Sequence, residues 1–257
     1  MLELKNVSVS AGTADEGEIE ILYNISLTLE EKKIYVVTGP NGGGKTSLAK
    51  AIMGIFPIRC GVLYLDGEDI TEKTITERAY LGIGYAFQAP TRFKGLRVRD
   101  FLAIAAQSDD EKTLCSLLVD VGLCAHDYID RELNASFSGG ELKRVEIASI
   151  LARNLRVALF DEPEAGIDLW SFQRLTEAFK RLNETHDTTI VIISHQERIL
   201  RLADEVILIS DGGIDDVTTP DRILGDLGAG KPDCVCDYCY DRRHSDRRQR
   251  KQLKVES

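Results

Sequence analysis

Residues 39–46, with the sequence GPNGGGKT, constrain the fold of this chain more than any other stretch. They fit the pattern G-x-x-x-x-G-K-[ST] and stand between a short apolar run, residues 34–38, and a helical pattern that begins at Lys45. In that setting successive backbone N–H groups turn inward around phosphate oxygens, and the following helix adds partial positive charge at its N-terminus. The sequence therefore predicts a strand–loop–helix unit that holds the phosphates of a nucleotide.

The residues expected to contact the nucleotide in this unit combine small side chains with one cation and two hydroxyls: Gly39, Pro40, Asn41, Gly42, Gly43, Gly44, Lys45, Thr46 and Ser47. We expect Lys45 to reach the β- and γ-phosphates, and the Thr46 hydroxyl to bind Mg²⁺.

Four further residues follow strand patterns and carry groups that suit ATP hydrolysis. We expect Asp161 to hold Mg²⁺ and the adjacent Glu162 to polarise the attacking water. The amide of Gln88 is expected to touch Mg²⁺ or that water, and His195 to hydrogen-bond the γ-phosphate and Glu162. The candidate catalytic residues are therefore Glu162, His195 and Gln88, and the candidate Mg²⁺ ligands are Thr46, Gln88 and Asp161.

A second phosphate-binding helix start is predicted at Ser138, Gly139, Gly140 and Glu141, which open a helical pattern. Such a start offers N–H groups and the positive end of a helix dipole. The phosphates in the first loop are already surrounded by their own loop, so this motif needs a nucleotide from elsewhere. We expect a head-to-tail homodimer held together by ATP, in which each Ser138 faces the nucleotide of the other copy.

Strand and helix patterns alternate along most of the chain, which favours a largely parallel sheet. Strands are expected at residues 2–9, 19–29, 34–38, 62–65, 82–87, 157–160, 189–193, 206–209 and 213–217, and helices at 45–55, 98–106, 112–121, 140–153 and 169–184. Helical spacing without strands between about 90 and 150 predicts an inserted helical lobe. We expect one domain at residues 1–225 and a separate tail at 226–257.

Charge and hydropathy exclude several classes of protein. The chain has 257 residues and a formal net charge of -10, which argues against general binding of nucleic acids. It has no run that approaches the roughly 18 apolar residues of a membrane span. Its first residues alternate like a strand and lack the form of a signal peptide. We expect a cytoplasmic protein.

As a set, these motifs resemble the ATP-binding cassette (ABC) ATPases over roughly residues 1–225, with Asp168 as a further matching residue at the nucleotide site. The resemblance implies a P-loop α/β fold with a mostly parallel sheet, an antiparallel β subdomain and an inserted helical lobe. Within the family the chain is most similar to the SufC type, through Glu141, where transporter ATPases usually have Gln, and through Ala165-Gly-Ile-Asp168. That likeness implies a Mg-dependent ATPase that changes the shape of a SufB/SufD-like scaffold for iron–sulfur cluster assembly.

Two other functions remain open. The catalytic motifs would equally serve the ATP-binding subunit of a membrane transporter, and Asp161-Glu-Pro163 is closer to the transporter pattern. A nucleotide-gated regulatory or metal-sensing protein would also use the same nucleotide site.

The tail contains three cysteines in six residues, Cys234, Cys236 and Cys239. Their spacing puts three soft ligands within reach of one Zn²⁺ or an iron–sulfur cluster. A solvated tail whose cysteines happen to cluster is the alternative.

Overall fold

The structure is a computed structural model that describes residues 1–11 and 19–228. The predicted cysteine ligands, Cys234, Cys236 and Cys239, lie outside the described residues. The chain divides into a unit of residues 1–221 and a unit that begins at Arg222. The helix α9 (Pro220–Gly228) spans the boundary between the two.

The larger sheet has six strands in the order β10-β9-β3-β8-β7-β6. All neighbouring pairs are parallel except the hairpin of β9 and β10. The strands are β3 (Ile34–Thr38), β6 (Ile83–Ala86), β7 (Val157–Asp161), β8 (Thr189–Ile193), β9 (Glu205–Ser210) and β10 (Gly213–Thr218). The carboxyl ends of the parallel strands therefore lie along one edge, where ligands of such sheets bind.

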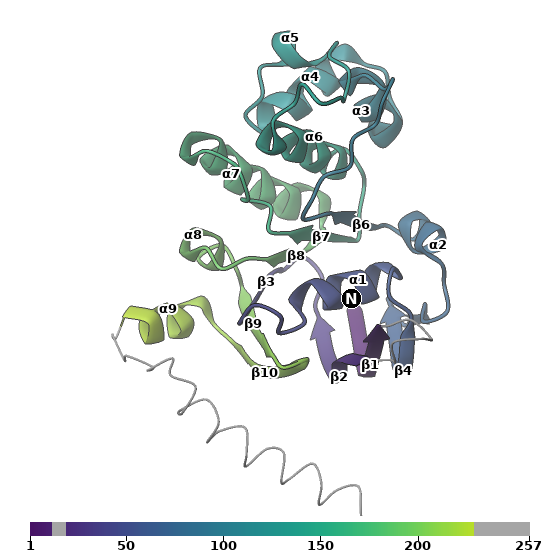
Figure 1. Cartoon of the computed structure of the whole chain (residues 1–257), viewed down its shortest axis with the longest axis vertical. Helices are drawn as coiled ribbons and strands as arrows, with labels where there is room; N and C mark the ends of the chain where they lie inside the picture. Colours follow the sequence, from purple (N-terminus) through teal and green to yellow (C-terminus); the bar gives the residue numbers. More distant parts are fainter. Residues whose placement is uncertain (12–18, 229–257) are drawn as a thin grey trace, which may run out of the picture. The chain divides into compact units, whose positions relative to one another are not determined.

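The smaller sheet is antiparallel, with the order β2-β1-β4-β5. Its strands are β1 (Leu2–Ala11), β2 (Ile19–Leu29), β4 (Ile58–Leu65) and β5 (Glu68–Asp69). The two sheets and the helices between and around them are drawn in Figure 1.

The helices of the first unit fall into two groups. Beside the sheets lie α1 (Lys45–Met53), α2 (Ile75–Tyr80), α7 (Leu169–His186) and α8 (Glu197–Leu200). Between β6 and β7 in the chain come α3 (Val98–Ala106), α4 (Glu111–Asp120), α5 (Ala125–Tyr128) and α6 (Gly139–Leu151), which gather at one end of the unit (Figure 1). Helix α6 contacts α3, α4 and β6, so it joins this group of helices to the larger sheet.

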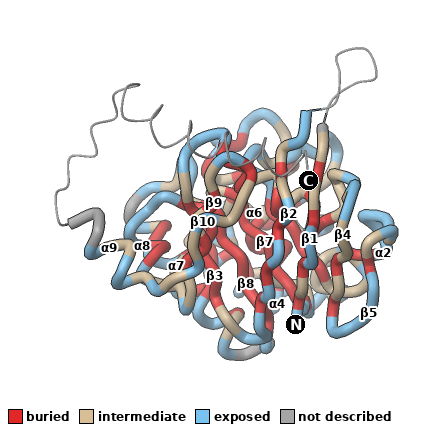
Figure 2. Tube along the Cα trace, turned by 90° about the horizontal axis from the view of Figure 1, so that it is seen from below, coloured by how far each residue is buried: buried red, intermediate tan, exposed pale blue. Residues whose placement is uncertain are grey.

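Burial on both faces explains the continuous apolar strands. Every residue of β3, β7 and β8 is buried, and these strands form the red centre of Figure 2. Alternate side chains such as Tyr35 and Val37 join the core shared with β1, β2 and α1. The opposite face carries Phe160, whose ring centroid lies 4.6 Å from that of Phe179 in α7. Strands of a parallel sheet are covered on both faces, so their residues are apolar in unbroken runs and do not alternate with polar ones.

The predicted fold class is confirmed: the sheet is mostly parallel, with an antiparallel second sheet and helices between β6 and β7. Strand β8 and helix α3 have the predicted bounds. Strand β4 begins at Ile58, four residues earlier than predicted, because the exposed residues at its start pair with β1. The short elements β5, α2, α5 and α8 were not predicted, since each spans too few residues to show a period.

The side chain of Arg78 fixes α2 against the end of α1. It is 2% exposed, and its guanidinium donates to the carbonyls of Ala51 at 2.7 Å and Ile52 at 2.8 Å. It also donates to the carbonyls of Lys73 at 3.0 Å and Thr71 at 2.7 Å. Carbonyls at the end of a helix have no partner within the helix, so this cation satisfies them and complements the helix dipole.

We predict that Arg78→Met lowers the free energy of unfolding by about 3 kcal/mol, because the carbonyls of Ile52, Lys73 and Thr71 lose their guanidinium donor and Ala51 keeps only the N–H of Gly54. Urea denaturation followed by circular dichroism measures the loss. The exposed Arg198 provides the control, and Arg198→Met is expected to change stability by less than about 0.5 kcal/mol. Equal stability of the two variants would contradict the structural role of Arg78.

Candidate nucleotide site

The glycine loop begins at Gly39, directly after β3, where the backbone lies too close to β9 for any side chain to fit. Gly39 has φ 138°, and a Cβ atom there would lie 1.9 Å from the carbonyl oxygen of Ile209 in β9. The loop ends at Gly44, with φ 107°, and α1 begins without a side-chain cap. The N–H groups of the first turn of α1 are thus available to an anion, as phosphate binding requires.

Lys45 bends back across this loop. Its ammonium donates to the carbonyls of Gly39 at 2.9 Å and Pro40 at 2.8 Å, and the residue is 7% exposed. Burial lowers the pKa of Lys45, while the charges of Glu162 and Asp161 act in the opposite direction. The cation is held where the loop closes, facing the two carboxylates that follow β7.

Asp161 is fully buried at the carboxyl end of β7. Its Oδ1 accepts a hydrogen bond from the Thr46 hydroxyl at 3.2 Å, and its Oδ2 accepts one from the Tyr85 hydroxyl at 3.0 Å. Burial, and then the charge of Asp161, raise the pKa of Tyr85, so its hydroxyl stays protonated and donates. The fold therefore brings together Thr46 and Asp161, two of the three predicted Mg²⁺ ligands.

These oxygens fit Mg²⁺, which prefers hard oxygen ligands and uses one or two carboxylates together with substrate phosphates. Across residues 1–11 and 19–228 there is no cluster of three or more His, Cys, Asp or Glu side chains that would hold a metal without a substrate. A Mg²⁺ ion held by Thr46 and Asp161 would take its remaining ligands from nucleotide phosphates and water.

Glu162 lies in a backbone conformation that is rare for a side chain of its size, with φ 46°. Its N–H donates to the Ile193 carbonyl at 3.0 Å, and its carboxylate accepts a hydrogen bond from the Gln88 amide at 2.8 Å. Left-handed conformations of this kind are found at functional sites, where surrounding contacts enforce them. Two predicted catalytic residues, far apart in sequence, are thus in direct contact.

His195 follows β8 at the same edge of the sheet. Its Nδ1 lies 3.4 Å from the hydroxyl of Thr38, at the end of β3. Burial lowers the pKa of His195, the positive charge of Lys45 lowers it further, and Glu162 opposes both. The imidazole is therefore neutral at pH 7, so that one ring nitrogen donates and the other accepts.

Lys143 is a residue of the site that sequence patterns did not indicate. It is 1% exposed, and its ammonium donates to the carbonyls of Asp161 at 2.9 Å and Gln88 at 3.0 Å. Burial lowers its pKa. A lysine in a helix usually faces water, and only the approach of α6 to the ends of β6 and β7 buries this one. It ties α6 to both segments that carry catalytic candidates.

Glu164 and Ser194 form a second unpredicted group. The Ser194 hydroxyl donates to Glu164 and accepts a hydrogen bond from the N–H of Gln196 at 3.0 Å. Burial raises the pKa of Glu164, and its second carboxylate oxygen is buried without a partner. This chain of bonds holds the turn that carries His195.

Ser138, Gly140 and Glu141, at the second predicted phosphate-binding helix start, contact their own helix and the turn before α7, and, in the part of the chain that the structure describes, not the glycine loop. Ser138 caps α6 by accepting from the N–H of Glu141 at 3.2 Å, and Glu141 accepts from the N–H of Ser138 at 2.7 Å. Gly140 packs so close to the turn before α7 that a Cβ would lie 2.1 Å from the Gly166 carbonyl oxygen. Asp168 caps α7, accepting from two backbone N–H groups at 3.0 Å. Among the described residues, Ser138 and Glu141 form no hydrogen bond to the glycine loop.

A family model described as "ABC transporter" matches residues 22–165, which contain the glycine loop, Gln88, Ser138 and Asp161. The chain belongs to this family. Members of the family bind and hydrolyse ATP, so the nucleotide of this site is ATP and the chain is an ABC ATPase.

Relatives and solved structures agree with this assignment. The chain is 37% identical to an uncharacterized ABC transporter ATP-binding protein of Methanocaldococcus jannaschii, over 77% of this chain and 82% of that protein. It is 31% identical to the probable ATP-dependent transporter ycf16 of Antithamnion sp., over 78% and 83% of the two chains. Its fold matches the ATP-binding cassette MJ0796, in a dimeric post-hydrolysis state bound to ADP and Pi, with a TM-score of 0.77 and 24% identity. The match covers 86% of this chain and 99% of that chain.

We predict that Glu162→Gln in this ABC ATPase preserves ATP binding and slows turnover by about 10²-fold or more, since the substitution removes the carboxylate predicted to act as general base. Steady-state phosphate release and equilibrium binding of ATP measure the two effects. Glu177→Gln, on the exposed face of α7, is the matched control and is expected to hydrolyse ATP at the rate of the unmodified chain. Unimpaired turnover by Glu162→Gln would show that another residue activates the water.

Proposed function

We propose that this ABC ATPase is of the SufC type, and that Mg-dependent ATP hydrolysis at a homodimer interface drives a shape change in a SufB/SufD-like scaffold for iron–sulfur cluster assembly. The observation that carries the proposal is Glu141. Its carboxylate makes the capping box with Ser138 and also accepts from the Tyr128 hydroxyl, which makes it part of the lobe. Transporter ATPases usually have Gln at this position, as noted above.

The dimer part of the proposal rests on the separation of the two phosphate-binding helix starts. The glycine loop opens α1, and Ser138 opens α6 without a hydrogen bond to that loop among the described residues. A head-to-tail pair would place each Ser138 helix start on the ATP held by the other copy. The proposed composite site would then contain Asp168 and residues 138–141 from one copy and the glycine loop, Asp161, Glu162, Gln88 and His195 from the other.

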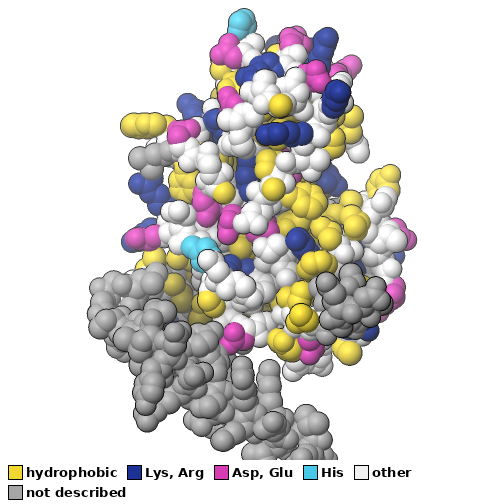
Figure 3. Space-filling view, viewed as in Figure 1, with side chains coloured by type: hydrophobic (Ala, Val, Ile, Leu, Met, Phe, Trp, Pro, Cys, Tyr) yellow, Lys and Arg dark blue, Asp and Glu magenta, His cyan; other side chains and the backbone are white. Residues whose placement is uncertain are grey.

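Surface chemistry supports a protein partner over a nucleic acid. Acidic and basic side chains are interspersed on the face drawn in Figure 3, without a continuous basic surface. In the part of the chain that the structure describes, no helix has the length and apolar character needed to span a membrane. We place the partner contact at the helices between β6 and β7 and at the segment that carries Gln88, and we expect the complex to be cytoplasmic.

The second candidate function is that of the ATP-binding subunit of a membrane transporter. Two observations favour it. Pro163 follows Glu162 as in transporter ATPases, and relatives of this chain carry names that describe them as transporter ATP-binding proteins. The motifs of the ATP site serve both functions, so the partner decides between them.

We predict that mixing two inactive variants restores activity if the sites are shared between copies. A Ser138→Arg chain and a Lys45→Ala chain would together form one site with both lesions and one intact site. ATPase activity of the mixture is expected to exceed the mean of the separate variants. A mixture of Lys45→Ala with Asp161→Asn is the control and is expected to restore little, because both lesions then lie on the same side of the site.

We further predict that the full-length chain, isolated from its own cells with a mild affinity tag, carries a soluble β-helical scaffold as its stoichiometric partner. Mass spectrometry identifies the partner, and ATPase assays with and without it measure coupling. Recovery of a multi-span membrane protein instead would establish the transporter function and contradict the assembly proposal.

A further inference from the structure

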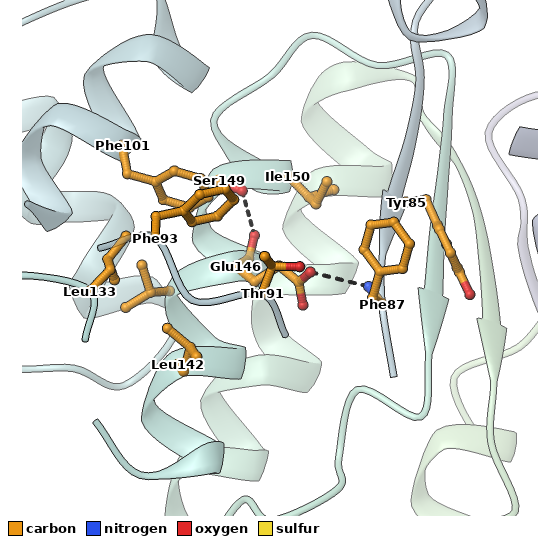
Figure 4. Close-up of a pocket in the computed structure, with 11 residues that line it drawn as sticks. Tyr85, Phe87, Thr91, Phe93, Phe101, Leu133, Leu142, Glu146, Ser149 and Ile150 are labelled. Atoms are coloured by element: carbon orange, nitrogen blue, oxygen red, sulfur yellow. Dashed lines mark hydrogen bonds between the residues drawn. The ribbon is translucent and has the colours of Figure 1, made fainter. Parts of the chain in front are cut away.

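A pocket of about 180 Å³ lies where α3 and α6 meet the end of β6. Its walls are largely apolar and include Phe87, Phe93, Phe101, Leu142 and Ile150. Figure 4 shows these side chains surrounding the carboxyl group of Glu146. Phe87 and Phe93 are 40% and 41% exposed, so aromatic surface remains open to solvent at this place.

Glu146 has one satisfied and one unsatisfied oxygen. Its Oε1 accepts a hydrogen bond from the N–H of Phe87 at 3.2 Å. Its Oε2 is buried and has no hydrogen-bond partner among residues 1–11 and 19–228. Burial raises the pKa of Glu146 to about 7, and the Phe87 N–H and the charge of Lys143 oppose the rise only in part. A buried carboxylate oxygen without a donor is costly, so a donor brought from outside would be bound favourably.

Among the described residues, no Lys or Arg supplies that donor. Lys143, one turn before Glu146 on α6, directs its ammonium to the carbonyls of Asp161 and Gln88. Among the described residues no Lys or Arg forms an ion pair with Glu146. The Tyr85 hydroxyl, on β6, donates to Asp161 instead.

The walls favour a particular kind of donor. A long basic side chain combines an apolar stem, which suits the leucine and isoleucine surface, with a charged head that pairs with a carboxylate. Its cation also interacts favourably with aromatic faces such as those of Phe87 and Phe93. A neutral amide or hydroxyl would satisfy the oxygen without neutralising its charge, and a wholly apolar side chain would leave the oxygen unpaired.

We infer that this pocket seats a single Arg or Lys side chain of the partner protein, with Glu146 as its counter-charge. The inference rests on the proposed function only in requiring a protein partner, and it holds for a scaffold or a membrane subunit alike. Glu146 is then the residue that determines which partner helix or loop fits.

The position of the pocket couples its occupant to hydrolysis. The N–H group that binds Glu146 belongs to Phe87, and the next residue, Gln88, donates to the carboxylate of Glu162. Lys143 binds the carbonyl of Gln88 from the other side. A cation that draws the Glu146 carboxylate toward itself would weaken the hydrogen bond from the Phe87 N–H. It would thereby change the position of the adjacent Gln88, which contacts the predicted general base, Glu162.

The test uses the full-length chain with two small probes, n-butylguanidinium and its neutral isostere n-butylurea. Side-chain carboxyl ¹³C NMR follows the titration of Glu146, with its signal assigned by Glu146→Gln. We expect n-butylguanidinium to bind at least about tenfold more tightly than n-butylurea, a difference of about 1.4 kcal/mol. We also expect it to lower the pKa of Glu146, because a nearby cation favours the ionised carboxylate.

Two variants separate the charge of Glu146 from general effects. Glu146→Gln should bind both probes equally, and Glu184→Gln, at an exposed position on α7, should behave as the unmodified chain does. Equal affinity of the unmodified chain for the two probes, binding of neither, or an unchanged pKa of Glu146 would each overturn the inference. The comparison of the two probes on the unmodified chain does not require the partner to be known, so it fails or succeeds independently of the scaffold assignment.

Discussion

Asp161 is fully buried at the end of β7, and side chains from three other elements donate hydrogen bonds to it. Its side chain accepts from Thr46 of α1 and from Tyr85 of β6, and its backbone carbonyl accepts from Lys143 of α6. A carboxylate enclosed in this way is stable only when hydrogen bonds replace its water. The positions of α1, β6 and α6 relative to one another are therefore tied to one residue, and the geometry of the ATP site follows from them.

Burial also sets the electrostatics of the site. It lowers the pKa values of Lys45 and Lys143, and it raises those of Glu146 and Glu164. Buried cations and carboxylates, held by backbone groups as much as by each other, form an environment that is organised before any nucleotide arrives. Preorganised charges of this kind are the largest contribution that a protein makes to phosphoryl transfer.

Helix α6 joins three features of the structure. Its first turn carries the capping pair Ser138 and Glu141, which we propose faces a second copy; Lys143, one turn later, reaches the ends of β6 and β7; and Glu146 lines the pocket proposed for a partner side chain. Residues three apart lie on neighbouring positions of a helix surface, so Lys143 and Glu146 face the same region. A shift of α6 would therefore act on the proposed dimer contact, the predicted general base and the proposed partner contact together.

The amino-acid sequence was sufficient to predict the fold class and to propose the principal groups of the ATP site. Strands that are buried on both faces show as unbroken apolar runs, and the glycine loop has a pattern that few other structures require, so Lys45, Thr46 and Asp161 could be proposed as site residues from local sequence. Contacts across the chain could not be assigned in this way. The sequence placed Gln88 and Glu162 in one site by motif, but only the pairing of β6 with β7 brings them within 2.8 Å.

Residues whose role depends on burial could not be identified from the sequence. Lys143 and Glu146 have the composition of a solvated helix face, but the surrounding helices and β6 bury the Lys143 side chain and one carboxylate oxygen of Glu146. Arg78 is similar, since its partners are backbone carbonyls, which every sequence contains. The sequence by itself indicated the phosphate loop, the alternation of the longer strands and helices, and the family. The tertiary structure decided which charged side chains are buried, because burial depends on the packing of segments far apart in the chain.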